Sequence, residues 1–362
     1  MCDGNFMNCQ NSTEIGLSEQ RRPLIVQYLG DTKNNSSLRV FVISGQHGDE
    51  RYGRKATQRF IARFSKTFES EFPLISLAVL VDANPDGSSI KNRVNAIGID
   101  LNRDHLLLDS KETLAMHSFV NSWKPHVVID IHNYPSKRKH LLEKNHAYYH
   151  DIFIDIPTNP AAQQQLHLDK NQMDDFIKHI QEDLKINGYS CDRYVIISPS
   201  GRVRHGTPDI TDARNFLSLR YGALTVLLEG RNPTKEDGSD GKEHIVLAQC
   251  HALASILQIL AETYKKQSIR NIDDFLPSKG DDVAIGSKYV HSKQPLKLTL
   301  KNTSTNNLDD VTLSKYTPDL QITKYIELPT AYAVPIRNKR LMEILLRHGF
   351  SFYQSDGKKI EN

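Results

Sequence analysis

Short and nearly continuous apolar runs are the feature that most constrains the fold of this chain. The clearest runs are LRVFVIS (38–44), LISLAVLVD (74–82), HVVIDIH (126–132) and ALTVLLE (223–229), with amphipathic, helix-like stretches between them. Strands that are apolar on both sides belong in a sheet that helices cover on both faces. The pattern therefore predicts an α/β fold with a mixed, largely parallel central sheet and helices on both faces.

Composition and patterning divide the chain into three parts. Residues 1–20 are polar and rich in Asn, Ser and Gln, which favours a disordered or flexible tail. Residues 21–268 hold the alternating strands and helices of the predicted α/β domain. In residues 285–362, segments such as 295–302 alternate apolar and polar residues. They predict a small β-rich C-terminal domain that ends in a helix.

The charge and apolar content exclude some classes of protein. Of the 362 residues, 38% are apolar and 25% charged, and the net charge of +3 leaves no basic excess that would bind nucleic acid. No run approaches the roughly 18 consecutive apolar residues of a membrane span, so we expect no transmembrane segment. The sequence indicates nothing about the oligomeric state.

The cysteines bear on the cellular location. Cys2, Cys9, Cys191 and Cys250 are too scattered for a disulfide scaffold, although a Cys2–Cys9 bridge is permitted. A Cys directly after Met1 also fits a lipoprotein whose signal peptide has been replaced by a start codon. The alternative is an ordinary polar tail. We expect a periplasmic or secreted protein, with a lipid anchor at Cys2 as one option, in preference to a cytoplasmic one.

The stretch GQHGDE (45–50) follows the first of the predicted strands. His47 and Glu50 are spaced i, i+3, so an imidazole and a carboxylate can reach one ion. A catalytic zinc takes three protein ligands and leaves a fourth position for water, so the pair requires another ligand. His132 and Glu229 also end strands, where ligand sites of such sheets form. Alone, His-x-x-Glu is a weak signal.

Further motifs make the chain resemble the zinc carboxypeptidase family of the carboxypeptidase A type, also called funnelins. The marks occur in the family's order over about residues 38–230: HGDE, NPDG (84–87), Arg93, GIDLNR (98–103), DIHNYP (130–135) and TVLLEG (225–230). The resemblance implies a zinc-dependent metallocarboxypeptidase. Such an enzyme hydrolyses a peptide or amide bond next to a free C-terminal carboxylate.

The resemblance also assigns the metal ligands. His47, Glu50 and His132 would hold one Zn²⁺, which polarises the scissile carbonyl and acidifies a water. Asp100 would accept a hydrogen bond from His47 and determine its tautomer. A simple turn cap is the alternative for Asp100.

Four further residues would act on the substrate. Glu229 would be the general base, with a salt bridge to Arg231 as its alternative role. Arg93 would stabilise the oxyanion. Asn102 and Arg103 would bind the terminal carboxylate of the substrate, for which the planar guanidinium is well suited.

The chain departs from the family pattern in the loop before Glu229. The family's substrate-binding Tyr usually precedes a Ser-Gly pair, but Ile197 stands at that position and Tyr194 lies three residues too early. The contacts of the substrate on this side are therefore not assigned.

The same loop is basic, with Arg202, Arg204, His205 and, further on, Arg214. If it lines the side-chain pocket, the pocket would favour an acidic terminal residue or diaminopimelate, as in a bacterial cell-wall peptide. A solvated loop is the alternative. Two other functions stay open: an aspartoacylase-like deacylase of N-acyl amino acids, and a catalytically inactive peptide-binding module.

Overall fold

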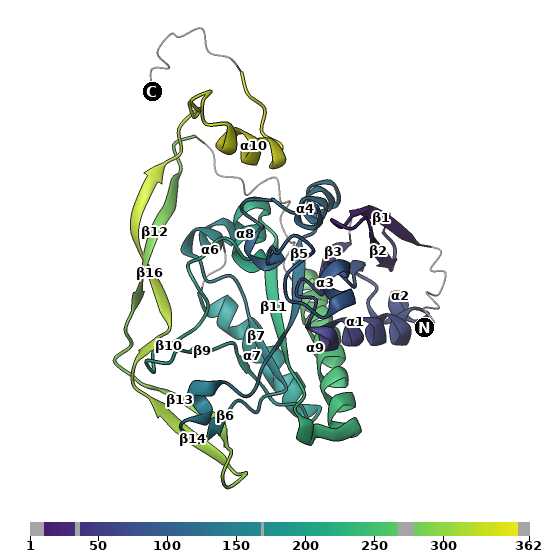
Figure 1. The fold of residues 1–362 in the computed structure, drawn as a ribbon, viewed down its shortest axis with the longest axis vertical. Coiled ribbons are helices and arrows are strands. Elements are labelled where there is room, and N and C mark those ends of the chain that lie inside the picture. The colour runs from purple at the N-terminus through teal and green to yellow at the C-terminus, as the bar shows by residue number, and fades with distance from the viewer. Residues whose placement is uncertain (1–10, 33–36, 168–169, 267–278, 354–362) are drawn as a thin grey trace.

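An eight-stranded sheet forms the centre of the protein, with strand order β1-β2-β4-β3-β5-β11-β7-β8. The computed structural model (Figure 1) describes residues 11–32, 37–167, 170–266 and 279–353. The strands of the sheet are β1 (Ser12–Leu17), β2 (Pro23–Leu29), β3 (Leu38–Ser44), β4 (Ile75–Leu80), β5 (Val127–Tyr134), β7 (Ile152–Asp155), β8 (Cys191–Arg193) and β11 (Leu224–Arg231). Strands β4, β3, β5 and β11 run parallel, while β2 and β7 pair with them in the antiparallel sense.

Helices cover both faces of this sheet, so the predicted fold class is confirmed. One face packs against α1 (Arg51–Phe64), α7 (Lys170–Ile186) and α9 (Gly238–Lys266), and the other against α4 (Lys111–Trp123) and α8 (Ala213–Tyr221). The shorter helices are α2 (Phe68–Glu71), α3 (Pro85–Ile90), α5 (Lys139–Leu142), α6 (Pro160–Leu166), α10 (Lys339–Arg347) and the 3₁₀ turns η1 (Leu101–Arg103) and η2 (Lys235–Asp237).

The two-residue period of a strand explains why the apolar runs are continuous. In β3, Val40 and Val42 pack on the side of α1 and α9, whereas Phe41 and Ile43 pack on the side of α4 and α8. Because successive side chains point to opposite faces, a strand covered on both sides needs apolar residues at nearly every position.

Helix α9 is long and apolar. The helical segment Lys235–Thr263 is the one described segment that could cross a membrane by length and composition, with a mean hydropathy of 1.6 in its most apolar window. Of that window, 67% is buried inside the protein. Helix α9 packs against α1, α7 and the sheet, as a helix of the protein core does.

The expectation of a flexible tail over residues 1–20 is wrong for its second half, while residues 1–10 lie outside the described residues. Residues 12–17 form β1, which pairs antiparallel with β2 at the sheet edge. Ser18 Oγ then donates to Asp86 Oδ1 at 2.8 Å, within the NPDG turn. A polar edge strand is stabilised mainly by backbone pairing, which composition does not reveal.

The C-terminal segment is β-rich, as expected, but it is not a separate domain. Its strands are β12 (Asp282–Val290), β13 (Leu296–Asn302), β14 (Leu308–Leu313), β15 (Tyr316–Thr317) and β16 (Asp319–Glu327). Strand β13 pairs with β6 (His146–Ala147), and β15 pairs with β10 (Val203–Arg204), which pairs in turn with β9 (Ile196–Ile197). Figure 1 shows the β12–β16 ribbon along the edge of the molecule far from β1 and β2.

A shared apolar cluster explains this integration. Leu298 and Leu300 of β13 are buried together with Tyr134, Phe153 and Val203 of the α/β part. The neighbouring short strands are correspondingly divided: β8 belongs to the central sheet, and β9 joins the small sheet with β10 and β15.

Phe60 of α1 offers a test of this packing. Its ring is fully buried and lies 4.7, 6.5 and 6.3 Å from the rings of Phe64, Phe68 and Phe72. Replacing a buried Phe by Ala removes apolar contacts and leaves a cavity, so Phe60→Ala should lower the free energy of unfolding by about 3–5 kcal/mol. Ile186→Ala, at a side chain that is 84% exposed, should change it by less than about 0.5 kcal/mol. Equal denaturation midpoints for both variants would contradict this packing.

Candidate active site

The candidate site lies at the carboxyl ends of three neighbouring parallel strands. Strand β3 leads into the loop with His47, β5 carries His132 near its end, and β11 carries Glu229. In the register of β5 and β11, Glu229 lies directly beside His132. Side chains at paired positions of a sheet point to the same face, so these residues converge on one place.

The three predicted metal ligands form a compact buried group. One ligand atom each from His47, Glu50 and His132 lies within 4.8 Å of the others. The Nδ1 atoms of His47 and His132 lie 2.8 and 3.0 Å from the two oxygens of Glu50 and 3.1 Å from each other. Both imidazoles therefore turn the same nitrogen toward a shared point.

Glycines and one amide shape the loop that carries His47. Gly45 has a φ of 75°, and a Cβ on Gly48 would lie 2.1 Å from the backbone of Gly87. Asn84, the first residue of NPDG, donates from Nδ2 to the carbonyl oxygens of Gln46 and Arg93 at 3.1 and 3.3 Å. The NPDG turn thus positions both the His47 loop and the segment of Arg93.

The outer nitrogens of both histidines face carboxylates. His47 Nε2 lies 3.0 Å from Asp100 Oδ1, as the sequence predicts, and Asp100 Oδ1 also accepts from the backbone of Asn102 at 3.0 Å. Asp100 is therefore both a turn cap and a partner of His47. His132 Nε2 lies 3.0 Å from Asp130 Oδ2. With Nε2 protonated toward a carboxylate, each Nδ1 is left bare for a metal.

Electrostatics keeps these carboxylates ionised. Burial alone would raise the pKa of Glu50, but the charge and the hydrogen bond of His132 hold it well below its usual range. Burial of Asp100 is likewise outweighed by its hydrogen bond to His47 and by the charge of Arg93, so the pKa of Asp100 is low. For His132, burial is outweighed by Asp130 and Glu50, which raise its pKa well above 6.5.

Glu229 differs from the other acidic residues of the site. Its Oε2 is buried and has no hydrogen-bond partner among the described residues, although the residue keeps some exposed surface. Burial raises the pKa of Glu229 to about 7, against the opposing charge of His132. Arg231 instead pairs with Asp237 at 2.9 Å, so the alternative salt bridge to Glu229 does not form.

The cations predicted near the site occupy different positions. Arg93 is 45% exposed at its side chain and donates from Nε to Asp100 Oδ2 at 2.9 Å. Its Nη1 lies 3.7 Å from Glu50 Oε1. Arg103 is exposed, and its Nη1 donates to the carbonyl of Asn102. Asn102 is buried, with Nδ2 3.1 Å from His132 Nε2 and Oδ1 accepting from a backbone N–H of α8.

The basic residues before Glu229 have different surroundings. Arg204 stacks on Tyr289 of β12 and donates to its hydroxyl, so its contacts join it to the C-terminal segment. His205 lies 2.7 Å from the hydroxyl of Tyr316. Arg202 is exposed, whereas Arg214 is buried.

Arg214 and Tyr194 lie within electrostatic reach of Glu229. Arg214 pairs with Asp155 at 2.7 Å, and its Nε is buried with no hydrogen-bond partner in the segments that the structure describes. Burial raises the pKa of Tyr194, and the charge of Glu229 adds to this rise while that of Arg214 opposes it. Arg214 of α8 is therefore a buried cation on which the charge of Glu229 acts.

Sequence reasoning missed several groups that support the site. Asp130 lies two positions before His132, so the strand period places both side chains on one face and offered a signal for it. Gln46 donates to Asp130 Oδ1 at 2.7 Å, and Asn133 N donates to Glu50 Oε2 at 2.9 Å. An amide beside a predicted ligand carries no signal of its own.

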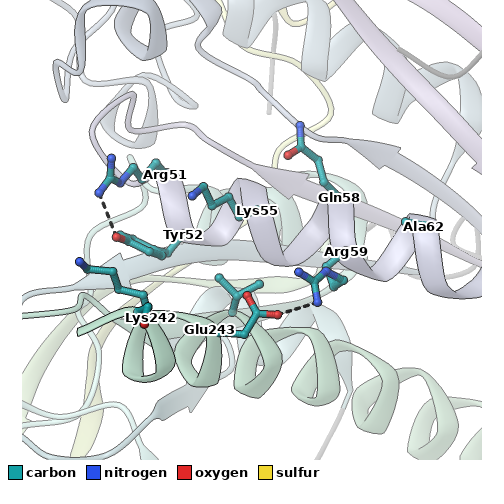
Figure 2. Close-up of a pocket in the computed structure, with 10 residues that line it drawn as sticks. Arg51, Tyr52, Lys55, Gln58, Arg59, Ala62, Lys242 and Glu243 are labelled. Carbon is teal, nitrogen blue, oxygen red and sulfur yellow. Dashed lines mark hydrogen bonds and ion pairs between the residues drawn. The ribbon is translucent and has the colours of Figure 1, made fainter. Parts of the chain in front are cut away.

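A groove of about 620 Å³ lies elsewhere, between α1 and α9 (Figure 2). Arg51, Lys55 and Lys242 line it, and Arg59 pairs across it with Glu243 at 2.6 Å. None of the described residues that line this groove belongs to the candidate site. The groove therefore has no part in the chemistry considered below.

The donor set fits zinc. Two imidazole nitrogens and one carboxylate, with both histidines supported by acidic partners, match a catalytic zinc that keeps one position for water. An α/β sheet that carries such a group beside a buried carboxylate of pKa about 7 is the arrangement of a metallohydrolase.

Comparison with known families agrees with this class. The family model described as zinc carboxypeptidase matches residues 6–137, which include His47, Glu50, Arg93 and His132. The resemblance seen in the sequence is thereby confirmed for this segment. Glu229 lies beyond the matched segment.

Curated relatives and solved structures point the same way. The chain is 24% identical to "Carboxypeptidase 2" of Trichophyton rubrum over 88% of this chain and 61% of that protein, so it spans about three fifths of that relative's length. A metallo-carboxypeptidase from Pseudomonas aeruginosa, solved with (2-guanidinoethylmercapto)succinic acid, superposes with a TM-score of 0.55 at 19% identity, covering 73% and 67% of the two chains. One from Burkholderia cenocepacia gives a TM-score of 0.52 at 18% identity, with 70% and 65% covered. These structures share the fold.

Metal binding can be tested directly. We expect about one zinc per chain by elemental analysis, and Glu50→Ala should lose tight binding because it removes a third of the ligand set. His179→Ala, at an exposed position of α7, should keep the metal.

The pKa of His47 is raised by Asp100 and Glu50 against its burial, and that of His132 is raised as well. Protons therefore compete with zinc, and affinity measured by chelator competition should fall as pH is lowered through these raised values. Tight stoichiometric binding by Glu50→Ala would contradict the ligand set.

Proposed function

We propose that this protein is a zinc-dependent metallocarboxypeptidase that hydrolyses an amide bond next to a free C-terminal carboxylate. The observation that carries the proposal is the environment of Glu229. Glu229 has a pKa of about 7 and a buried oxygen that lacks a hydrogen-bond partner within the described part of the chain, and it lies in register beside His132 of the metal group. A general base is most effective when its pKa is close to the working pH.

The residues divide the chemistry among them. When bound, zinc would polarise the scissile carbonyl and acidify a water molecule. Glu229 accepts the proton of the attacking water and delivers it to the leaving nitrogen. Arg93, held by Asp100 beside Glu50, stabilises the negative charge that develops on the carbonyl oxygen.

The free carboxylate of the substrate is bound by Arg103. Its guanidinium is exposed and, among the residues that the structure describes, donates from Nη1 to the neighbouring carbonyl of Asn102, so it can turn toward an anion. A guanidinium matches a carboxylate with two parallel hydrogen bonds. Asn102 stays part of the proposal as a second donor, although its amide now lies against His132.

An acidic terminal residue, such as glutamate or diaminopimelate, is the substrate that we propose for this site. Arg214 supports this preference because it is a buried cation within electrostatic reach of Glu229, and its Nε has no partner among the residues described. A bacterial cell-wall peptide would supply such a residue. This substrate accords with a location outside the cytoplasm, which also remains part of the proposal; Cys2 lies outside the described residues.

Glu229→Gln tests the base. The variant should lower kcat by about 10²–10⁴-fold, because the amide cannot accept the proton, while it retains zinc. In the wild type, kcat/KM should fall as the pH drops through the pKa of Glu229. This pKa should lie at or below about 7, because bound zinc lowers it further. The same acidic decrease in kcat/KM should be absent from any residual activity of the variant. Mass spectrometry of peptide products measures both. Equal rates for the two proteins would refute the assignment, and activity confined to N-acyl amino acids would indicate a deacylase.

Arg214→Gln tests the pocket. Because a hydrogen bond to a charged group contributes about 1.5–3 kcal/mol, the preference in kcat/KM for a terminal Glu over Ala should fall about 10- to 100-fold. Arg202→Gln, at an exposed residue of the same region, is the matched control and should keep the preference. Arg204→Ala in the same assay tests the sequence-based expectation for that residue. An unchanged preference in Arg214→Gln would exclude Arg214 from the pocket.

A further inference from the structure

A chain of buried hydrogen bonds leads from the metal group into the protein interior. It starts at His132, whose Nε2 lies 3.0 Å from Asp130 Oδ2. The other oxygen of Asp130 accepts from Gln46 Nε2 at 2.7 Å, and Gln46 Oε1 lies 2.8 Å from His105 Nε2. Gln46, His105 and Asp130 are completely buried.

The chain continues across the second helix layer. His105 Nδ1 lies 3.0 Å from His117 Nε2, and His117 Nδ1 lies 3.0 Å from the hydroxyl of Tyr221. His105 follows the turn η1, His117 belongs to α4, and Tyr221 is the last residue of α8. The contacts thus connect the metal group to three further elements on the same face of the sheet.

One arrangement of protons satisfies every link. Asp130 is an ionised acceptor, so the amide nitrogen of Gln46 must face it and the amide oxygen must face His105. His105 then carries its proton on Nε2, which leaves Nδ1 to accept from Nε2–H of His117. His117 Nδ1 in turn accepts from the hydroxyl of Tyr221. All donors after His132 therefore point toward Asp130.

This arrangement requires that both histidines of the chain be neutral. Burial lowers the pKa of His105 to about 4 and that of His117 well below its usual value. Each ring therefore carries a single proton near neutral pH, and a chain of aligned hydrogen bonds polarises its members in one direction. If either ring were cationic, the donors could not all point one way.

We propose that Gln46, His105 and His117 are positioning residues of the metal site. Acting through Asp130, they hold the ring of His132 with Nε2 protonated and Nδ1 directed at the metal. The inference rests on the proposed metal role of His132 and is independent of the substrate. The partners of a metal-bound histidine orient the ring and raise its basicity, and loss of such a partner typically costs about 10- to 100-fold in metal affinity.

The outer end of the chain is covered by the C-terminal helix. The ring of His348, which follows α10, lies 5.8 Å from that of His117 in an edge-on arrangement. His348 Nε2 is 2.9 Å from the carbonyl oxygen of Leu106, and Arg220 donates to the carbonyl of His348 at 3.2 Å. Beneath this cover His117 is buried, and its burial favours the neutral ring.

The first experiment uses the wild-type protein, whose histidines are labelled with ¹⁵N. Between pH 6 and 8, NMR should show His105 and His117 as neutral rings with the proton on Nε2 and a bare Nδ1. A cationic ring, or an Nδ1–H tautomer at either residue, would reverse the direction of the donors and overturn the proposal. This measurement needs neither a variant nor enzymatic activity.

The second experiment measures zinc affinity by chelator competition. His105→Leu should weaken binding about 10-fold, whereas His105→Gln, which retains a donor and an acceptor, should restore affinity to within about 3-fold of the wild type. His150→Leu is the matched control, because His150 is also buried, packs against Phe153 and lies outside this chain of hydrogen bonds. It should bind zinc like the wild type.

Thermal unfolding of each metal-free variant separates positioning from stability. A folded His105→Leu that binds zinc like the wild type, or an equal loss in His150→Leu, would overturn the proposal. If His105→Leu does not fold, Tyr221→Phe serves instead: it removes the outermost donor and should shift the ¹⁵N signals of His105. Unchanged signals there would contradict a connected chain. Loss of peptidase activity with these results intact would refute only the proposed function.

Discussion

The parallel pairing of β3, β5 and β11 is the constraint on which the rest of the molecule depends. It brings three carboxyl ends to one edge and places Glu229 in register beside His132. The two-residue period of β5 then turns Asp130 toward the same face as His132. Neither the convergence of the ligand atoms nor the burial of the base would survive a shift of one residue, because every side chain would move to the opposite face.

The central elements could be predicted because their signals are local. Apolar runs locate β3, β5 and β11 to within a few residues. Strand β1 was missed because its residues are polar, although its partner β2 is the next strand along the chain. The segment of β13 was recognised, but its pairing was not, because its partner β6 is distant in sequence: Lys301 pairs with Ala147. Periodicity reports which face of a strand is apolar, not which chain segment lies beside it.

The same division applies to the site. Residues in ordered motifs, such as His47 and Asp100, are found where the motifs place them. The supports of His132 come from separate elements, and each looks alone like an ordinary polar residue. The loop before Glu229 was recognised as basic, but charge alone could not show that Arg204 binds Tyr289 while Arg214 is buried beside Asp155.

The two imidazoles are supported in physically different ways. Asp100, behind His47, is held by Arg93 at a partly exposed ion pair, whereas Asp130, behind His132, is held by uncharged groups in the interior. Dissolved ions screen exposed charges strongly and buried contacts weakly. Raising the ionic strength therefore weakens the Arg93–Asp100 ion pair behind His47 and leaves the Gln46–Asp130 contact behind His132 almost unchanged. Salt thus affects the two histidines of the site unequally.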